Sequence, residues 1–161
     1  MNPLLEPRFT FTEAALAAGV KPKTVRNWLD RGQIHLDAEE QREGEGWRRF
    51  SALDALRIAA VARLVERCIP VSKASRIVEV GIINRRCGHL LVYEKTPLKA
   101  VVAAFTNIVF CVCENGDDYF FSEAYGSKLD LIELGLHTEK DVMIFLLENI
   151  FREVFENLEV E

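Results

Sequence analysis

FTFTEAALAAGVKPKTVRNWLDRG, which occupies residues 9–32, predicts two short helices joined by a turn. The first helix is expected over residues 12–18, where strong helix formers follow Thr10 or Thr12 as the N-cap and a glycine ends the run. The second helix begins at Pro22, because proline is favoured in the first turn, and it stops before the next glycine. Two helices joined by a turn of about three or four residues form the helix-turn-helix pattern.

The second helix has one apolar and one polar face. Val25, Trp28 and Leu29 recur at helical spacing, so we expect them to pack in a core. The other face carries cations and hydrogen-bonding groups, namely Lys21, Lys23, Thr24, Arg26 and Asn27. Arginine can donate two hydrogen bonds to guanine or phosphate and asparagine can pair with adenine, so these side chains suit the reading of a DNA groove. A solvated face, or a surface that binds protein, is the alternative.

A hairpin is predicted after the two helices. Residues 33–36 and 46–50 are short β-prone pieces on either side of the polar, glycine-bearing stretch 37–45. Trp47 lies in the second piece, where its ring could pack while its N–H points toward phosphate. The hairpin would therefore form the wing of a winged helix.

Two further helices are predicted beyond the hairpin. Ser51 and Asp54 form an S-x-x-D start signal for a helix with a regular apolar stripe. Pro70 ends this helix and opens another, which is expected to reach about Val80.

This order of elements resembles the MerR-type winged-helix regulators. The matching segments are residues 9–20, 24–28, 31–32 and 46–54. The resemblance covers about half the chain and implies that Arg26 and its neighbours contact DNA from the recognition helix. It also implies that the wing holds flanking phosphates through Arg42, Trp47 and Arg48, with Arg49 beside them.

The sequence departs from the family pattern at two places. Carboxylates at Asp37, Glu39, Glu40, Glu43 and Glu45 surround Arg42 in the hairpin, and Asn27 stands where an aromatic residue is usual. Two other functions therefore stay open. One is an excisionase-like or phage-type architectural factor that bends DNA, and the other is an adaptor whose winged helix binds protein, which the acidic hairpin favours.

The second half has a different pattern. A strand is predicted at 90–93, and residues 98–105 suit a short helix or another strand. Residues 107–113 and 119–121 are β-prone and are separated by an Asn-Gly-Asp-Asp turn, which predicts a hairpin. This half resembles no family that the residues identify.

A C-terminal amphipathic helix is predicted over residues 138–158, with Thr138 as the N-cap and Asp141 at its third position. Its apolar residues alternate at spacings of three and four, which makes a seam of Ile144, Leu147, Phe151, Val154 and Leu158. The seam must be buried in its own domain, in a second subunit or in both. We expect it to serve dimerisation, as C-terminal helices generally do in the resembled class.

The cysteines do not indicate a disulfide framework, and reduced thiols fit a cytoplasmic protein of a bacterium-like cell. Cys111 and Cys113 alternate onto one strand face, which would permit chelation of a metal but equally describes two small buried side chains. We expect no metal, no cofactor and no catalytic residues, because no known catalytic spacing is present. Nothing suggests a signal peptide or a membrane span.

Charge is uneven along the chain, whose net charge is −5. Residues 1–80 carry 13 basic and 11 acidic side chains, whereas residues 81–161 carry 7 and 14. The expected class is α+β, with a winged helix-turn-helix DNA-binding domain at 1–85. A small mixed α/β dimerisation or effector domain follows at 86–161 and ends in the amphipathic helix. Double-stranded DNA and a second copy are the expected partners, and any effector ligand stays unknown.

Overall fold

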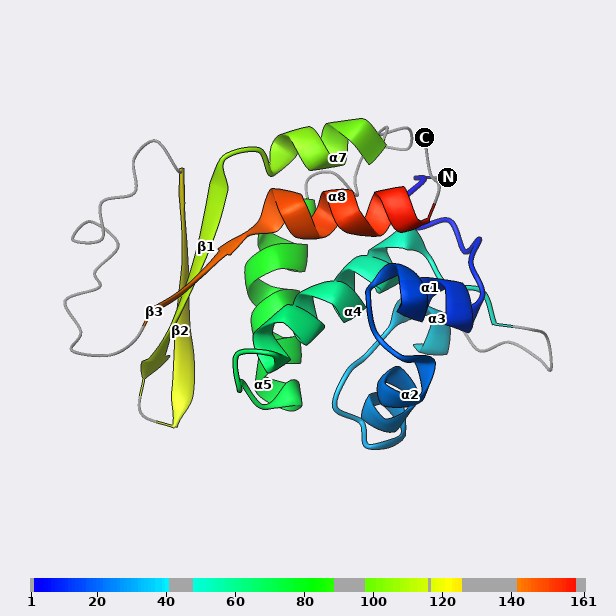
Figure 1. The fold of residues 1–161 in the computed structure, drawn as a ribbon, viewed down its shortest axis with the longest axis horizontal. Helices are drawn as coiled ribbons and strands as arrows, with labels where there is room; N and C mark the ends of the chain where they lie inside the picture. The colour runs from blue at the N-terminus through cyan, green and yellow to red at the C-terminus, as the bar shows by residue number, and fades with distance from the viewer. Residues whose placement is uncertain (1, 41–47, 89–97, 116, 126–141, 159–161) are drawn as a thin grey trace.

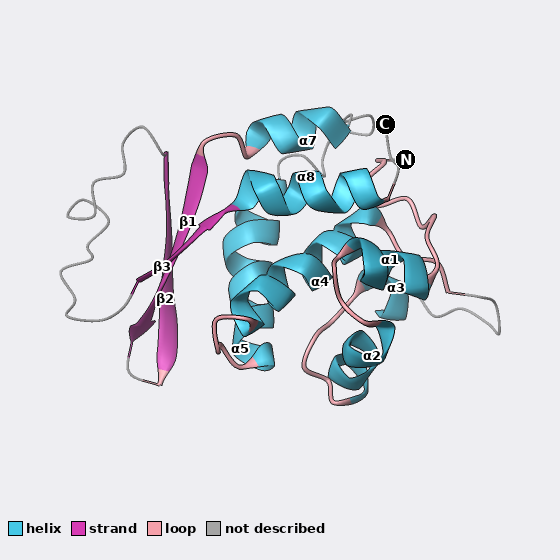
Figure 2. Ribbon diagram, viewed as in Figure 1, coloured by secondary structure: helices cyan, strands magenta, loops and turns pink. Residues whose placement is uncertain are grey.

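A computed structural model describes residues 2–40, 48–88, 98–115, 117–125 and 142–158. The helices are α1 (Phe11–Ala17), α2 (Pro22–Asp30), α3 (Asp37–Glu40), α4 (Ala52–Val65), α5 (Val71–Ile77), the π-helix η1 (Val78–Cys87), α7 (Leu98–Ala104) and α8 (Leu147–Asn157). The strands are β1 (Ile108–Asn115), β2 (Asp118–Tyr125) and β3 (Val142–Leu146). The helices gather on one side and the sheet lies at the other end of the molecule (Figures 1 and 2). The fold is α+β, as the sequence predicts.

The helix-turn-helix is confirmed in α1 and α2. Thr10, not Thr12, is the N-cap of α1: its hydroxyl accepts a hydrogen bond from the Glu13 N–H at 3.2 Å, and its own N–H donates to the Glu13 carboxylate at 2.7 Å. This reciprocal capping box fixes where the helix begins. Gly19, with φ of 72°, reverses the chain after α1. Glycine suits that left-handed conformation because it has no Cβ to clash.

The structure differs from the predicted hairpin. Residues 33–36 do not form a strand, and Asp37 begins the short helix α3 in the stretch expected to be the tip. Ile34 and Leu36 are buried in the core, so packing overrides their β-propensity. The described β-contact of this region is instead the antiparallel bridge between Phe9 and Phe50. Residues 41–47, with Arg42 and Trp47, lie outside the described residues.

Helix α4 begins at the S-x-x-D signal of Ser51 and Asp54, as predicted. The Ser51 hydroxyl accepts a hydrogen bond from the Asp54 N–H at 3.1 Å, and the Ser51 N–H donates to the Asp54 carboxylate at 3.0 Å. This second capping box starts α4. The next helix is longer than expected, because α5 continues beyond Val80 as η1 to Cys87. Buried apolar residues in η1 explain the extension.

The sheet is three-stranded, antiparallel and ordered β2-β1-β3. The hairpin predicted at 107–121 is formed by β1 and β2, with Val112 opposite Phe121. Residues 98–104 form a helix, α7, so the alternative strand is wrong. The strand predicted at 90–93 lies outside the described residues.

The predicted C-terminal helix is wrong in its first part. Residues 142–146 form β3, paired with β1 so that Ile144 lies opposite Cys111, and the helix begins only at Leu147. An apolar run of this length fits a strand and a helix equally, and pairing with β1 decides between them. The proposed cap residues Thr138 and Asp141 lie outside the described residues.

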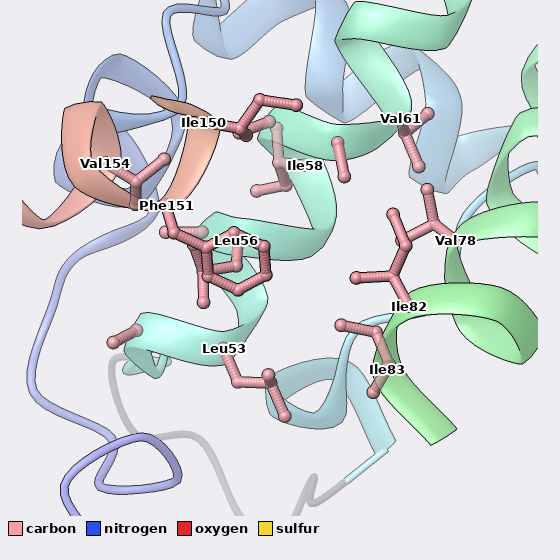
Figure 3. Packing of buried hydrophobic residues seen from close by; sticks show 14 of the residues in the cluster. Leu53, Leu56, Ile58, Val61, Val78, Ile82, Ile83, Ile150, Phe151 and Val154 are labelled. Carbon is pink, nitrogen blue, oxygen red and sulfur yellow. The ribbon is translucent and has the colours of Figure 1, made fainter. Parts of the chain in front are cut away.

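One hydrophobic core joins the two halves of the chain. Figure 3 shows Ile150, Phe151 and Val154 of α8 on one side of α4, and side chains of η1 on the other. Phe105, which follows α7, stacks on Phe151 with ring centroids 4.1 Å apart. At the far end of α8 the Asn157 amide donates to the Ala17 carbonyl at 3.1 Å. The C-terminal helix is thereby attached directly to the helix-turn-helix.

Candidate nucleic-acid interface

The recognition helix α2 buries its apolar face and exposes its polar one. Val25 and Trp28 pack in the core, as predicted, and Leu29 packs against its edge. Four of the proposed contact residues are exposed and one is half-buried: Lys21, Lys23, Arg26 and Asn27, with Thr24. The cationic face is therefore open to a partner.

Aromatic rings order the Arg26 side chain. Its guanidinium lies over the Phe11 ring, 4.9 Å from the centroid. Phe11 in turn packs on Phe50 with centroids 5.5 Å apart. An exposed cation held over a ring gains about 0.5–1 kcal/mol, so less conformational freedom of the side chain remains to be lost on binding. Arg26 is thus held against α1 through Phe11.

Two more arginines lie at that bridge. Arg8 and Arg49 immediately precede the paired residues Phe9 and Phe50, and the Arg49 guanidinium donates to the Arg8 carbonyl at 3.3 Å. The Arg8 guanidinium lies 6.0 Å from the centroid of the Phe9 ring. Both side chains are exposed. Sequence reasoning missed Arg8, which the pairing of Phe9 with Phe50 brings beside Arg49.

The N-terminus of α2 adds a favourable field for anions. Lys21 is the N-cap residue, Pro22 follows it, and no side chain caps the first turn. The amide of Lys23 stands in that first turn, where helix N–H groups lack intrahelical partners. Such N–H groups and the positive end of the helix dipole favour phosphate oxygens, as do the exposed ammonium groups of Lys21 and Lys23.

A partly buried ion cluster lies behind the helix-turn-helix sequence, on α3, α4 and η1. Arg57 of α4 contacts Asp37 of α3 at 2.8 Å, Asp54 at 3.5 Å and Glu79 of η1 at 3.2 Å. Asp54 also accepts hydrogen bonds from the Ser51 hydroxyl at 2.9 Å and the Asp37 N–H at 2.9 Å. The cluster joins α3, α4 and η1 at one point.

Burial and the neighbouring charges have opposite effects on the pKa values of Asp54 and Arg57. Burial raises the pKa of Asp54, against the hydrogen bonds from Ser51 and the nearby guanidinium. Burial lowers the pKa of Arg57, but the hydrogen bond to Asp37 and the carboxylates of Asp37, Glu79 and Asp54 outweigh it and raise the pKa overall. Arg57 is therefore a structural cation and not part of the exposed surface.

Of the residues predicted to form the wing, only those at its end belong to the described surface. Arg48 and Arg49 are exposed, and they lead into Phe50, whose ring packs on Phe11 of α1. Arg42 and Trp47 cannot be placed, since they fall outside the described residues.

The seam expected to hold two subunits together faces the chain's own interior. Leu147, Phe151, Val154 and Leu158 are buried within a single chain, whereas Ile144 is on β3 and exposed. These four residues are therefore buried in their own domain, which is one of the options that the sequence left open, and Ile144 is not. Dimerisation itself stays a prediction.

The cysteines do not assemble a metal site in the part of the chain that is described. Cys111 and Cys113 are buried on one face of β1, and burial, with a smaller contribution from Cys113, raises the pKa of the Cys111 thiol. Burial raises the pKa of Cys87 to about 12. Among the described residues no group of three or more His, Cys, Asp or Glu is arranged to hold a metal ion.

The arrangement defines a class of protein: a helix-turn-helix whose second helix presents an open cationic face. Residues 9–80 match the family model of the MerR HTH family regulatory proteins, so this part of the chain is a MerR HTH family domain. Domains of this family belong to DNA-binding transcriptional regulators, which are typically not enzymes. No curated protein matches the chain significantly. No described helix is both long enough and apolar enough to cross a bilayer.

Proposed function

We propose that the protein is a sequence-specific regulator of transcription that binds double-stranded DNA as a homodimer. The observation that carries the proposal is the open face of α2, where Arg26 is ordered over Phe11 and the remaining polar residues are accessible. Arginine and asparagine at such a face can read base edges in the major groove.

Each part of the surface has a distinct task in this proposal. Arg26 and Asn27 contact bases, while Lys21, Lys23 and Thr24 hold phosphates at the N-terminus of α2. Arg8 and Arg49 hold the phosphate backbone beside the groove, together with the wing residues Arg42, Trp47 and Arg48. Residues 1–85 would thus provide DNA binding and residues 86–161 assembly or effector sensing.

The test is selection of bound fragments from genomic DNA with the purified full chain, followed by fluorescence anisotropy on the best site. Arg26→Ala should weaken binding by about 1–3 kcal/mol if the side chain pairs with a base. Lys23→Ala should weaken binding on all sequences alike and reduce the slope against log salt by about 1, since one phosphate contact is lost.

Arg152→Ala is the matched control. Arg152 is an exposed arginine on α8 and is paired with Glu148, so its loss removes the same charge away from α2. Equal affinity of the wild type, Arg26→Ala and Arg49→Ala would refute the docking surface. Binding that does not weaken with salt would refute DNA as the partner.

The arrangement of the selected sites separates this proposal from the architectural alternative. A two-fold dimer requires inverted half-sites whose centres are whole helical turns apart, about 10 bp or a multiple of it. Direct repeats clustered at recombination sites would instead favour an excisionase-like factor.

A further inference from the structure

The guanidinium of Arg26 is held by an aromatic ring and not by a carboxylate. It lies 4.9 Å from the centroid of the Phe11 ring, and within the described part of the chain no ion pair involves it. Arg76, which is also exposed, is instead paired with Asp118. A phosphate or a base would have to displace the carboxylate from Arg76, whereas it meets no such competitor at Arg26.

Contact with a ring leaves the hydrogen-bonding groups of Arg26 available. A cation is attracted to the face of a ring by the ring's quadrupole, so no N–H has to be donated to an acceptor. The guanidinium donors form a rigid planar fork that matches guanine or phosphate. Phe11 therefore restricts where the fork lies without using its donors.

Local structure fixes the position of the Phe11 ring. Phe11 is the first residue of α1, and the capping box of Thr10 and Glu13 determines where that helix begins. The ring packs on Phe50 with centroids 5.5 Å apart, and Phe50 is 1% exposed. Phe50 is held in turn by its backbone bridge to Phe9. The ring is thus supported both by the start of α1 and by the core.

We propose that Phe11 is a positioning residue for DNA recognition, which acts through Arg26 and does not contact DNA itself. In the free protein the ring holds the guanidinium near the place that it occupies in the complex. The entropy cost of ordering this long side chain is then incurred before DNA arrives and not during binding. The proposal rests on the proposed function, because it concerns the same DNA contact.

The surroundings of Phe11 favour an indirect role. Its side chain is half-buried, packs against the hydrophobic core and has no polar atom with which to read a base edge. Arg26 is exposed and belongs to α2, the helix proposed to enter the groove. Leucine at position 11 would keep an apolar side chain there but has no ring quadrupole, so this replacement separates packing from positioning.

The first test is a double-mutant cycle, measured with the full chain by anisotropy on the selected DNA site. Phe11→Leu should weaken binding about 2- to 10-fold, which corresponds to the cost of ordering one long side chain on binding. In the Arg26→Ala background the same replacement should change the affinity by less than about 2-fold, because the side chain that the ring positions is gone. Phe11→Tyr keeps the ring and should bind like the wild type.

Tyr119→Leu is the matched control. It removes a contact of the same kind in the second half of the chain, where the Lys73 ammonium lies 5.7 Å from the centroid of the Tyr119 ring. We expect this replacement to leave the affinity for DNA unchanged.

The second test observes Arg26 in the free protein by NMR. Protons that lie over the face of a ring are shifted upfield by the ring current, so the Arg26 δ protons should show this shift in the wild type and in Phe11→Tyr. The shift should disappear in Phe11→Leu and persist in Tyr119→Leu. Circular dichroism and urea unfolding verify that each variant is folded.

Four results would overturn the inference. Unchanged affinity of Phe11→Leu means that the ring does not assist binding, and a loss that persists in the Arg26→Ala background means that Phe11 acts on its own. Binding by Phe11→Tyr that is as weak as by Phe11→Leu means that the ring contact is not responsible. Absence of the upfield shift in the wild type means that the ring does not hold Arg26 in solution.

The NMR measurement needs no DNA, so the two proposals can fail separately. A wild type that binds DNA without the shift refutes only the role of Phe11. A wild type that shows the shift but binds no DNA refutes the proposed function, and the role of Phe11 in recognition with it.

Discussion

Replacing Asp54 with alanine is expected to destabilise the protein strongly, because one carboxylate serves several groups. It accepts hydrogen bonds from the Ser51 N–H at 3.0 Å, the Ser51 hydroxyl at 2.9 Å and the Asp37 N–H at 2.9 Å. It also lies 3.5 Å from the Arg57 guanidinium. Alanine removes all of these acceptors at once.

The magnitude follows from burial. Loss of a capping interaction costs about 1 kcal/mol. Ser51 is buried, so its N–H loses its acceptor where water has little access, which costs about a further 1–3 kcal/mol. Arg57 keeps Asp37 and Glu79 and is not left unpaired. Burial raises the pKa of Asp54, so removing its charge returns part of the loss. We expect about 2–3 kcal/mol.

The assay is urea unfolding followed by far-ultraviolet circular dichroism, with Glu13→Ala as the matched control. Glu13 occupies the same position in the capping box of α1, but it is exposed. Its replacement should therefore cost much less. If Asp54→Ala costs no more than Glu13→Ala, burial does not strengthen the capping box and the reasoning is refuted.

The pH dependence of stability tests the direction of the Asp54 pKa shift. Because the pKa of folded Asp54 is raised above 3.8, the folded state binds the proton more tightly than the unfolded state. The stability of the wild type relative to Asp54→Asn should therefore fall as the pH rises from 3.8 through the folded pKa. A rise over that window would mean that the hydrogen bonds and Arg57 outweigh burial.

Three further predictions concern the core, the thiols and the first helix. Phe151→Ala should cost about 3–5 kcal/mol in urea unfolding, because the ring is buried and stacks on Phe105; a loss below about 1 kcal/mol would contradict the packing. Cys68 should react with a thiol reagent in the folded protein while Cys87 reacts only after unfolding, since Cys68 is exposed and burial raises the pKa of Cys87 to about 12; peptide mass spectrometry distinguishes the two. A carboxyl NMR titration should give Glu13 a pKa below 4.5, so its contribution to stability is present above 4.5 and is lost as the pH falls through the folded value; a midpoint at or above 4.5 would contradict the capping box.

Local signals in the sequence predicted the two helices of the helix-turn-helix and the start of α4, but not the irregular backbone of residues 33–36. A capping box depends on residues three apart, so Ser51 with Asp54 locates the start of α4 without tertiary information, whereas Thr10 and Thr12 were both candidates for the cap of α1. The polar face of α2 follows from helical spacing in the same way. The exposed candidates for DNA contact could therefore be named from the sequence.

Features that depend on distant contacts could not be predicted. Residues 142–146 have the composition of a helix seam or of a strand, and only their partner β1 decides. Ile34 and Leu36 resemble a strand, but the core holds them in irregular backbone before α3. Arg8 and Arg26 are 18 positions apart, and no periodicity relates them. Long-range pairing and packing override local propensity at each of these places.

The attachment of α8 to α1 and α4 affects how the protein can be divided. A fragment ending near Cys87 would lack Phe151, Val154 and the other α8 side chains that cover α4, and the Ala17 carbonyl would lose the Asn157 amide. Apolar surface uncovered in this way promotes aggregation and loosens the helices beneath it. DNA binding should therefore be measured with the full chain, because partial unfolding of a shortened fragment would lower its apparent affinity for DNA.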